Sequence, residues 1–391
     1  MYTILTTNPV HASGNVGDAL ITYSAINMIR KETGVEDFQV FFRGEDLTSR
    51  LDVINASQAI IMPGFALREP MYPNTYALVE DLSMLKVPMI PLGAGWKAFP
   101  GDEWDSDALE YTDATLAFLN TVYQSAGSIT CRDVSTSEVL TRHGFDAVPV
   151  VGDCAWYRHD KLGRPFKKVH QPRRIVFTPP NAPAYHFQAR DVALMLRRDF
   201  PHSDIVCSFH SRLHEGDRRM RPFVESLNFD TAYLSHDADN LTLYEEYDLH
   251  VGYRLHGHLM FLRNRIPSVV LHEDGRGVGC TRTLGFGGFD AFQRRMAPPN
   301  ADRLERMFRT RPGRLVSRAM AKYSDSDAPP FQQMVAPVDP SLHEKVAAFL
   351  QEQLESGFSS YDAIAERIDS TYQDMMAPFL RSLPGAKGLS T

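Results

Sequence analysis

The sequence predicts an α/β protein with two Rossmann-like domains and a C-terminal helical extension. Three observations support this fold class: a length of 391 residues, short apolar runs that alternate with helical patterns, and a restart of this alternation after a polar stretch in mid-chain. A chain of this length usually exceeds one hydrophobic core, and alternating strands and helices are typical of parallel sheets. We therefore expect ligands to bind in a cleft between the carboxyl ends of the two sets of strands.

The first domain is predicted over residues 1–155. Its expected strands are Thr3–Thr6, Phe38–Phe42, Ala59–Met62, Pro88–Leu92, Ser128–Cys131 and Val148–Val151. Its expected helices are Asp18–Lys31, Asn74–Lys86, Ala108–Ser125 and Ser135–His143, the last ended by a glycine. Residues 156–173 are polar, basic and poor in periodic apolar positions, so we interpret them as an interdomain linker.

The second domain is predicted over residues 174–310. Its expected strands are Ile175–Thr178, Asp204–Ser208, Thr231–Leu234, Leu249–Val251 and Ser268–Leu271, and its expected helices are Ala189–Asp199, Leu241–Tyr247 and Gly257–Asn264. In the extension over 311–391, residues 311–340 are expected to be irregular, whereas Ser341–Ser356 and Ser360–Arg381 carry helical patterns. The sequence does not decide whether these last helices pack on the N-terminal domain or form a partner surface.

Charge and composition exclude several classes of function. A formal net charge of −7 argues against broad electrostatic binding of nucleic acid or anionic lipid, so an anionic ligand would need a local cluster of cations. The widely spaced cysteines Cys131, Cys154, Cys207 and Cys280 predict neither a zinc site nor a disulfide framework. The sequence shows no basic start followed by a long apolar run and no stretch of about 20 apolar residues. We expect a cytoplasmic protein with at most peripheral membrane contact.

The segment Gly14-Asn15-Val16-Gly17-Asp18 follows the first predicted strand and opens a helix. Its glycines permit a tight turn and close approach to a ligand, and a helix N-terminus offers free N–H groups. There is no Walker lysine, so an ATP site is not indicated. Asp18 either caps the helix or accepts a proton from a bound hydroxyl; the pattern leaves both readings open.

The segment from Val251 to His258 lies where a strand ends and a helix begins. Arg254 and His256 are separated by one residue, so in an extended turn both would project to the same side. A guanidinium binds carboxylate or phosphate in a fork and imidazole titrates near neutrality, so this pair fits binding and protonation of an anionic ligand. A histidine beside a helix start is, however, more often a cap or a buried structural residue.

Taken in order, these motifs make the chain resemble the polysaccharide pyruvyl transferases. The stretches that carry the resemblance are GNVGD at 14–18, SITCRDVSTSEVLTRHG at 128–144, VGDCA at 151–155 and GYRLHGHLMFLRNRIPSVV at 252–270. Their order and spacing match over roughly residues 10–285, which is far more specific than any single motif. The C-terminal hundred residues are not covered.

The resemblance implies a GT-B-like arrangement with the acceptor on the N-terminal domain and the donor on the C-terminal domain. It also implies phosphoenolpyruvate as donor, a glycan or lipid-linked glycan as acceptor, and no metal or cofactor. By motif position, Arg132 and Arg254 would hold the donor and His256 would act as the acid catalyst, with Asp18 as a second catalytic candidate. Whether the chain forms a homo-oligomer stays open.

Several other positions are candidates with alternatives. The glycine-rich stretch 272–290 offers Arg276 and Arg282 as further donor ligands, and the pattern does not choose between them. Its glycines at 275, 277 and 279 would form either a nest of N–H groups for phosphate or a flexible surface turn. Asp133 is expected to orient Arg132 or to start the next helix. For the acceptor, the candidates are Asn15, Gly17, Phe65 and Trp96, although such aromatics are more often part of the core.

Two rival functions share these features. A GT-B-type glycosyltransferase would use the same architecture with a nucleotide sugar, because fold does not determine chemistry. A non-catalytic relative would bind glycans or serve as a scaffold through the C-terminal helices. The DxD strings at 105–107, 237–239 and 325–327 lie in polar segments and are interpreted as solvated turns rather than metal sites.

Overall fold

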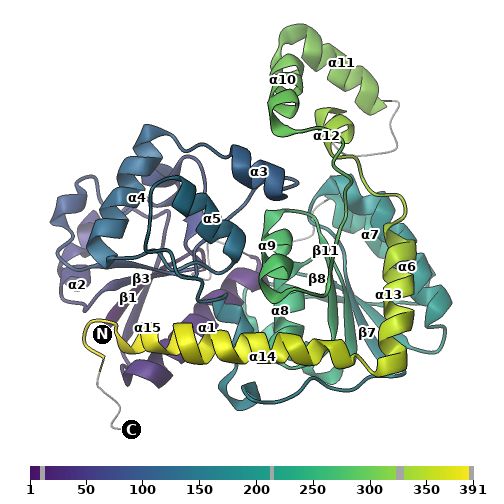
Figure 1. The fold of residues 1–391 in the computed structure, drawn as a ribbon, viewed down its shortest axis with the longest axis horizontal. Coiled ribbons are helices and arrows are strands. Elements are labelled where there is room, and N and C mark those ends of the chain that lie inside the picture. Colours follow the sequence, from purple (N-terminus) through teal and green to yellow (C-terminus); the bar gives the residue numbers. More distant parts are fainter. Residues whose placement is uncertain (9–13, 212–214, 323–329, 387–391) are drawn as a thin grey trace.

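The N-terminal half folds around a parallel sheet. The computed structural model describes residues 1–8, 14–211, 215–322 and 330–386, and Figure 1 shows the arrangement of its elements. The sheet has the order β2-β1-β3-β5, with all neighbouring pairs parallel: β1 (Tyr2–Thr6), β2 (Phe38–Phe42), β3 (Ile60–Pro63) and β5 (Met89–Leu92). Ladder bridges from Ala94 to Cys131 and from Cys131 to Val150 extend it, so the last two predicted strands are reduced to single bridges.

Five α-helices accompany this sheet within the described residues before 155. They are α1 (Val16–Thr33), α2 (Leu51–Asn55), α3 (Glu103–Ala108), α4 (Asp113–Ala126) and α5 (Val134–Arg142). A two-stranded ladder of β4 (Ala66–Leu67) and β6 (Gly95–Trp96) continues beyond the carboxyl ends of β3 and β5. The helix predicted over 108–125 begins later, at Asp113, because the Thr112 side chain accepts a hydrogen bond from the Thr115 N–H and so caps α4. Helix α3, which precedes it, was not predicted.

The predicted helix Asn74–Lys86 is wrong. This stretch is largely irregular, with a short 3₁₀ turn at Leu82–Met84. The Tyr72 hydroxyl donates to the carbonyl oxygens of Val79 and Glu80, at 2.6 and 2.8 Å, so these two carbonyls find a side-chain partner rather than a helical one. Tertiary contacts therefore outweigh the local helical pattern.

The C-terminal domain is built on a six-stranded parallel sheet. Its order is β12-β11-β10-β7-β8-β9, with β7 (Arg174–Thr178), β8 (Asp204–Phe209), β9 (Asp230–Tyr233), β10 (Leu249–Gly252), β11 (Ser268–His272) and β12 (Gly288–Asp290). The helices are α6 (His186–Asp199), α7 (Glu215–Ser226), α8 (Leu255–Arg263) and α9 (Gly275–Leu284), and the predicted helix at 241–247 is the 3₁₀ segment Ala238–Glu246. The strand order reverses between β7 and β10, and a doubly wound sheet places its ligand crevice at such a point.

The two domains share one apolar core around α1. Leu20 and Met28 of α1 belong to the same buried cluster as Trp156 and as Leu259 of α8. Trp156 and Tyr157, at the start of the predicted linker, are only 1% and 2% exposed. The beginning of that segment is therefore part of the interdomain core, which favours a fixed relation between the domains.

The C-terminal extension packs back across both domains. It contains α11 (Arg311–Lys322), α12 (Pro330–Val335), α13 (Leu342–Ser356), α14 (Asp362–Thr371) and α15 (Ala377–Arg381), and α10 (Pro298–Arg309) precedes it at the end of the predicted second domain. In Figure 1, α14 and α15 run as one rod beneath the two domains. At its end, Tyr372 and Arg381 donate to the two oxygens of Glu32 in α1, at 2.8 and 2.7 Å. The prediction of an irregular segment over 311–340 is wrong for α11 and α12, whereas residues 323–329 lie outside the described part.

The predicted fold class is thus confirmed: two Rossmann-like α/β domains face each other, and a helical extension follows them. The two sheets are separate, and helix α1 of the first domain packs against α8 of the second at the junction between them. Together with the C-terminal rod that returns to the first domain, this arrangement is GT-B-like.

Candidate active site

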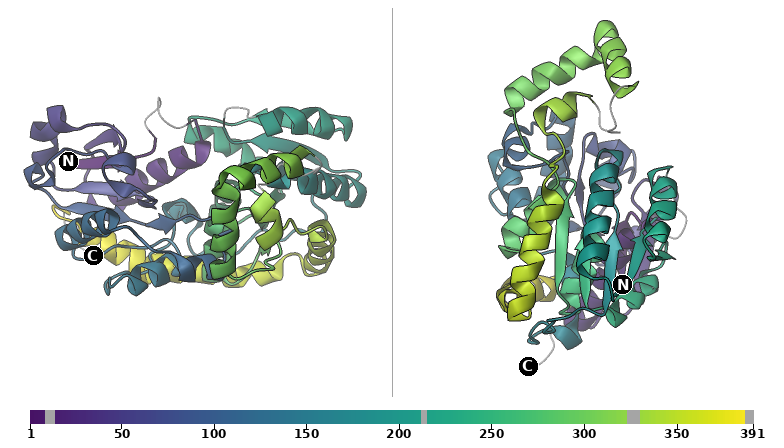
Figure 2. Two further views of the ribbon diagram at one scale, coloured as in Figure 1. Left: turned by 90° about the horizontal axis from the view of Figure 1, so that it is seen from above. Right: turned by 90° about the vertical axis from the view of Figure 1, so that its right-hand side faces the viewer.

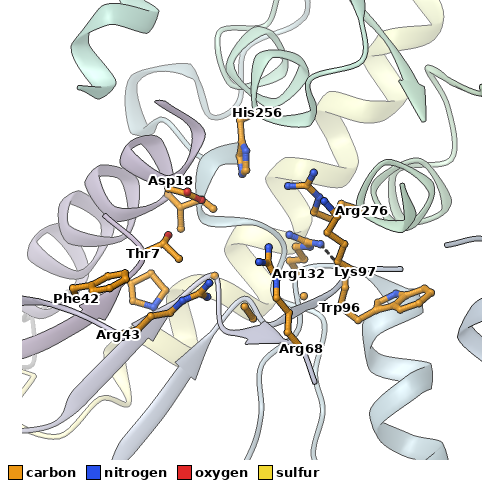
Figure 3. Close-up of a pocket in the computed structure, with 15 residues that line it drawn as sticks. Thr7, Asp18, Phe42, Arg43, Arg68, Trp96, Lys97, Arg132, His256 and Arg276 are labelled. Atoms are coloured by element: carbon orange, nitrogen blue, oxygen red, sulfur yellow. Dashed lines mark hydrogen bonds between the residues drawn. The ribbon is translucent and has the colours of Figure 1, made fainter. Parts of the chain in front are cut away.

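A cavity of about 300 Å³ lies between the domains, at the carboxyl ends of the N-terminal strands. Figure 3 shows the side chains that point into it. Among the residues that line it, five are arginines or lysines and one, Asp18, is a carboxylate; a histidine of the C-terminal domain lines it as well. The basic residues and the histidine are Arg43, Arg68, Lys97, Arg132, Arg276 and His256. Such a cavity attracts an anion.

Four of these cations directly follow a strand or a strand-like bridge. Arg43 follows β2, Arg68 follows β4, Lys97 follows β6, and Arg132 follows the bridge residue Cys131. Because parallel strands end at one edge of a sheet, residues that follow them meet there although they are far apart in sequence. Sequence reasoning found Arg132 through its motif and missed the other three. For Arg43 its place directly after a predicted strand was an available signal, whereas Arg68 and Lys97 follow β4 and β6, two short strands that were not predicted.

Arg132 is held in place by its neighbours. Its Nε donates to the Asp133 carboxylate at 3.0 Å and its Nη2 donates to the Trp96 carbonyl at 3.2 Å. A Cβ atom on Gly95 would lie 2.3 Å from the Arg132 guanidinium carbon, so only glycine leaves room for it. Asp133 also accepts from Thr136 and begins α5, which confirms both parts of its expected structural role.

His256 enters the cavity from the first turn of α8 and packs against the other domain. A Cβ atom on Gly17 would lie 2.2 Å from Nδ1 of His256. The second glycine of the GNVGD segment therefore serves the approach of the imidazole. His256 is 6% exposed, and its Nε2 has no hydrogen-bond partner among the described residues. An unpartnered buried nitrogen facing a polar cavity is free to engage a ligand.

The electrostatic surroundings of His256 favour the neutral imidazole in the empty site. Burial lowers its pKa most, Asp153 and Asp18 oppose that shift, and the cations Arg276 and Arg132 lower the pKa further. A bound anion would add negative charge beside the ring and raise the pKa again. The imidazole can therefore take up a proton when an anion binds.

The remaining cations repel one another. The pKa of Arg68 is lowered by burial and by the neighbouring charges of Arg43 and Arg276. Burial and Arg276 likewise lower the pKa of Lys97, although Lys97 pairs with Asp274 at 3.2 Å. Such strain between like charges is relieved when an anion binds, so the cavity is prepared for a multiply charged ligand.

The structure distinguishes Arg276 from Arg282. Arg276 lines the cavity and is fixed by a fork to Asp274, with its Nη2 2.7 Å from the carboxylate. Burial opposes the charge of Arg276, but Asp274 outweighs this and raises the pKa of Arg276. Arg282 is not among the lining residues, and it forms an ion pair with Glu138 at 2.9 Å. Of the two candidates, Arg276 is the one that faces the cavity.

Arg254 does not line this cavity, contrary to the expectation that it shares a ligand with Arg132. Its guanidinium lies near Ser211, with Nη2 3.3 Å from the hydroxyl oxygen. Arg254 and His256 do not project to the same side, because α8 begins at Leu255: Arg254 is the extended cap residue, whereas His256 is already in the helix. In a helix, successive residues turn by about 100°, so a spacing of two no longer brings side chains to one side.

The glycine-rich stretch is neither a nest nor a surface turn, and both predictions are wrong. It forms helix α9. A Cβ atom on Gly275 would lie 2.8 Å from the Gly101 carbonyl oxygen, and one on Gly279 would lie 2.7 Å from the Asp133 carboxyl carbon. The glycines therefore allow α9 to approach the N-terminal domain, which brings Arg276 to the cavity that Arg132 also lines.

In the GNVGD segment, one residue caps helix α1 and another lines the cavity. Asn15 caps α1, because its side chain accepts from the Gly17 N–H at 3.1 Å. Asp18 does not cap the helix; it lies in the first turn and lines the cavity near His256 (Figure 3). The expected acceptor contact of Asn15 therefore finds no place in this cavity, whereas Asp18 keeps its position as a catalytic candidate.

The predicted acceptor aromatics are core residues. Phe65 is fully buried and its ring lies 4.9 Å from that of Tyr76. Trp96 is 1% exposed, and Figure 3 shows its indole turned away from the cavity, so it contributes backbone to the lining. Aromatic character at a strand end thus reflects packing here.

Two further observations concern metals and membranes. In the described part of the chain, no three or more His, Cys, Asp or Glu residues gather as a metal-binding group. Over the same residues, no helix combines the length and the apolar character needed to span a bilayer.

Fold and site together define an α/β protein of two Rossmann-like domains with an anion-binding site between them. A family profile described as polysaccharide pyruvyl transferase matches residues 15–274, which is more than half of the chain and contains Asp18, Arg132 and His256. The chain therefore belongs to the polysaccharide pyruvyl transferase family, a family of transferases. A comparison with curated proteins found no match.

Solved structures of similar extent are only distantly alike. Anabaena Alr3699/HepE in complex with UDP and glucose has 9% identity and a TM-score of 0.48, with 98% of this chain and 99% of that chain covered. The UDP-GlcNAc 2-epimerase from Neisseria meningitidis bound to UDP-GlcNAc has 9% identity and a TM-score of 0.47, with 97% and 99% covered. At this level of similarity the ligands of those proteins carry no argument for this one.

Proposed function

We propose that this protein transfers a pyruvyl group from phosphoenolpyruvate to two hydroxyls of a glycan or glycoconjugate, forming a ketal. The observation that carries the proposal is the convergence of five cations and a histidine with a free nitrogen on one interdomain cavity. Phosphoenolpyruvate carries both a carboxylate and a phosphate, so it needs several cations within a small space. Family membership supports the same reaction class.

The proposed chemistry needs one proton donor and no change of oxidation state. Protonated His256 would give its proton to the methylene carbon of the donor, which leaves an oxocarbenium-like centre at the adjacent carbon. One acceptor hydroxyl attacks this centre, and its proton returns to His256 or passes to Asp18. Phosphate then departs, and the second hydroxyl closes the ketal and gives its proton to the phosphate. Arg132 and Arg276 would stabilise the phosphate charge throughout.

The first test is binding of phosphoenolpyruvate by calorimetry, with UDP-sugars as the comparison. We expect phosphoenolpyruvate to bind and to bind more tightly as pH falls, because the pKa of His256 is lowered in the empty site and a bound anion raises it. Titrations in buffers of different ionisation enthalpy should show proton uptake. In His256→Ala the proton uptake by the imidazole should vanish, so that only protonation of the ligand's own phosphate remains. Binding of a UDP-sugar in preference to phosphoenolpyruvate would favour a glycosyltransferase instead.

A second test uses a cation that the sequence analysis missed. Arg68 has no ion pair or hydrogen bond to another described residue, so Arg68→Gln should leave the melting temperature unchanged or slightly raised. Donor affinity should fall about 30-fold, the usual effect of one charge-assisted hydrogen bond. Arg282→Gln is the matched control, because Arg282 lies outside the cavity. Equal effects of both substitutions on donor affinity would show that this cavity is not the donor site.

A further inference from the structure

Helices α10 and α11 form a hairpin that stands away from the two domains. Figures 1 and 2 show it projecting beyond the body of the molecule, with α12 at its base. The two helices are joined through Thr310 and pack on each other. Arg294, just before the hairpin, pairs with Asp105 of α3 at 2.7 Å and with Asp102, which ties its base to the N-terminal domain.

Helix α11 exposes large apolar side chains to solvent and packs on α10 through a glycine, unlike an ordinary surface helix. Its contact with α10 runs through Gly313, which is buried; a Cβ atom there would lie 2.0 Å from the Met307 carbonyl oxygen. Its apolar side chains face outward: Leu315 is 66% exposed, Val316 50% and Met320 37%. Surface helices normally turn such residues toward the core. The outward apolar face therefore indicates a partner.

The hairpin is strongly basic, which indicates a partner with negative charge. Its two helices carry six exposed arginines against two acidic residues, in a chain whose formal net charge is −7. The arginines are Arg303, Arg306, Arg309, Arg311, Arg314 and Arg318. Those of α11 flank the apolar residues, since Arg314 and Arg318 lie one turn apart next to Leu315. The complementary surface is thus anionic and able to receive aliphatic side chains.

We propose that this hairpin docks on an anionic phospholipid surface. Leu315, Val316 and Met320 enter the interfacial region, while the arginines lie among the lipid phosphates. A nucleic acid would satisfy the charges but would leave the aliphatic side chains in water, so the lipid is the better match. This inference does not depend on the reaction proposed above.

The experiment measures binding of the full-length chain to vesicles of phosphatidylcholine with and without phosphatidylglycerol. We expect binding to the anionic vesicles, weakening with salt, and none to phosphatidylcholine alone. Arg314→Gln combined with Arg318→Gln should weaken binding about 30-fold, roughly fivefold per charge. Leu315→Ser combined with Val316→Ser should weaken it about tenfold through loss of apolar burial.

Matched controls lie elsewhere on the surface. Arg164→Gln and Leu194→Ser also change an exposed arginine and a leucine that is 47% exposed, and they should leave vesicle binding unchanged. All four altered hairpin positions are exposed, so melting temperatures should not change. Equal binding to both vesicle types, or equal losses in hairpin and control variants, would overturn the proposal. Absent binding to the anionic vesicles would overturn it as well, and a hairpin-dependent dimer or a hairpin-dependent nucleic-acid complex would then identify a different occupant of this surface.

Discussion

His256→Ala is expected to lower turnover by roughly 10²- to 10⁴-fold, as for the loss of a general acid, while donor binding at neutral pH persists. The fold should tolerate the change. The ring is buried with Nε2 unpartnered, and burial already lowers the pKa of the imidazole, so its removal deletes no hydrogen bond at that nitrogen. Turnover with phosphoenolpyruvate and an acceptor glycan, together with melting temperature, measures both effects.

Added imidazole provides the control for this variant. The space left by the side chain should admit the free base, and partial recovery of turnover would show that the ring acts chemically. A large fall in melting temperature without such recovery would instead assign His256 a structural role. Unchanged turnover would remove His256 from the reaction altogether.

Gly17→Ala is expected to reduce turnover by about 100-fold, although alanine favours helices more than glycine by about 1 kcal/mol. The new Cβ would lie 2.2 Å from Nδ1 of His256, so the imidazole or the domain contact must shift. A displacement of about 1 Å at a catalytic group costs this much in rate. Overpacking should also lower the free energy of unfolding by about 1–3 kcal/mol.

The double variant Gly17→Ala, His256→Ala isolates this contact. His256→Ala removes the two shortest contacts of the new methyl group, to Nδ1 and Cγ, and leaves only the Cβ atom of residue 256 at 2.8 Å. Gly17→Ala should therefore destabilise the His256→Ala background clearly less than the unmodified protein. A thermodynamic cycle from chemical denaturation of the four proteins gives the coupling free energy. If Gly17→Ala destabilises both backgrounds equally, the two domains do not meet through Gly17 and His256.

Much of the site could be predicted from local patterns. The GNVGD and RLHG segments each lie where a strand gives way to a helix, and this is a local property of glycine spacing and apolar runs. Their residues Asp18 and His256 consequently line the cavity. Arg132 was found in the same way, through a motif that also contains the Asp133 side chain that orients it.

Other features could not be read from local patterns. Arg43, Arg68 and Lys97 belong to no shared motif and meet because three strands end at one edge of the structure. The error at Arg254 came from applying an extended-chain period across the first residue of a helix. Phe65 was misjudged because burial depends on Tyr76 and Phe118, which approach it from elsewhere in the chain.

By itself the sequence determined the two-domain α/β class, the order of most strands along the chain, and the family. These follow from periodicity and from motifs whose residues are neighbours in the chain. The tertiary structure alone decided that Arg276 rather than Arg282 faces the cavity, that the glycines of α9 allow the domains to meet, and that the apolar side chains of α11 face outward. Each of these depends on what a distant segment brings to within contact distance, and side-chain packing between distant segments leaves no local period in a sequence.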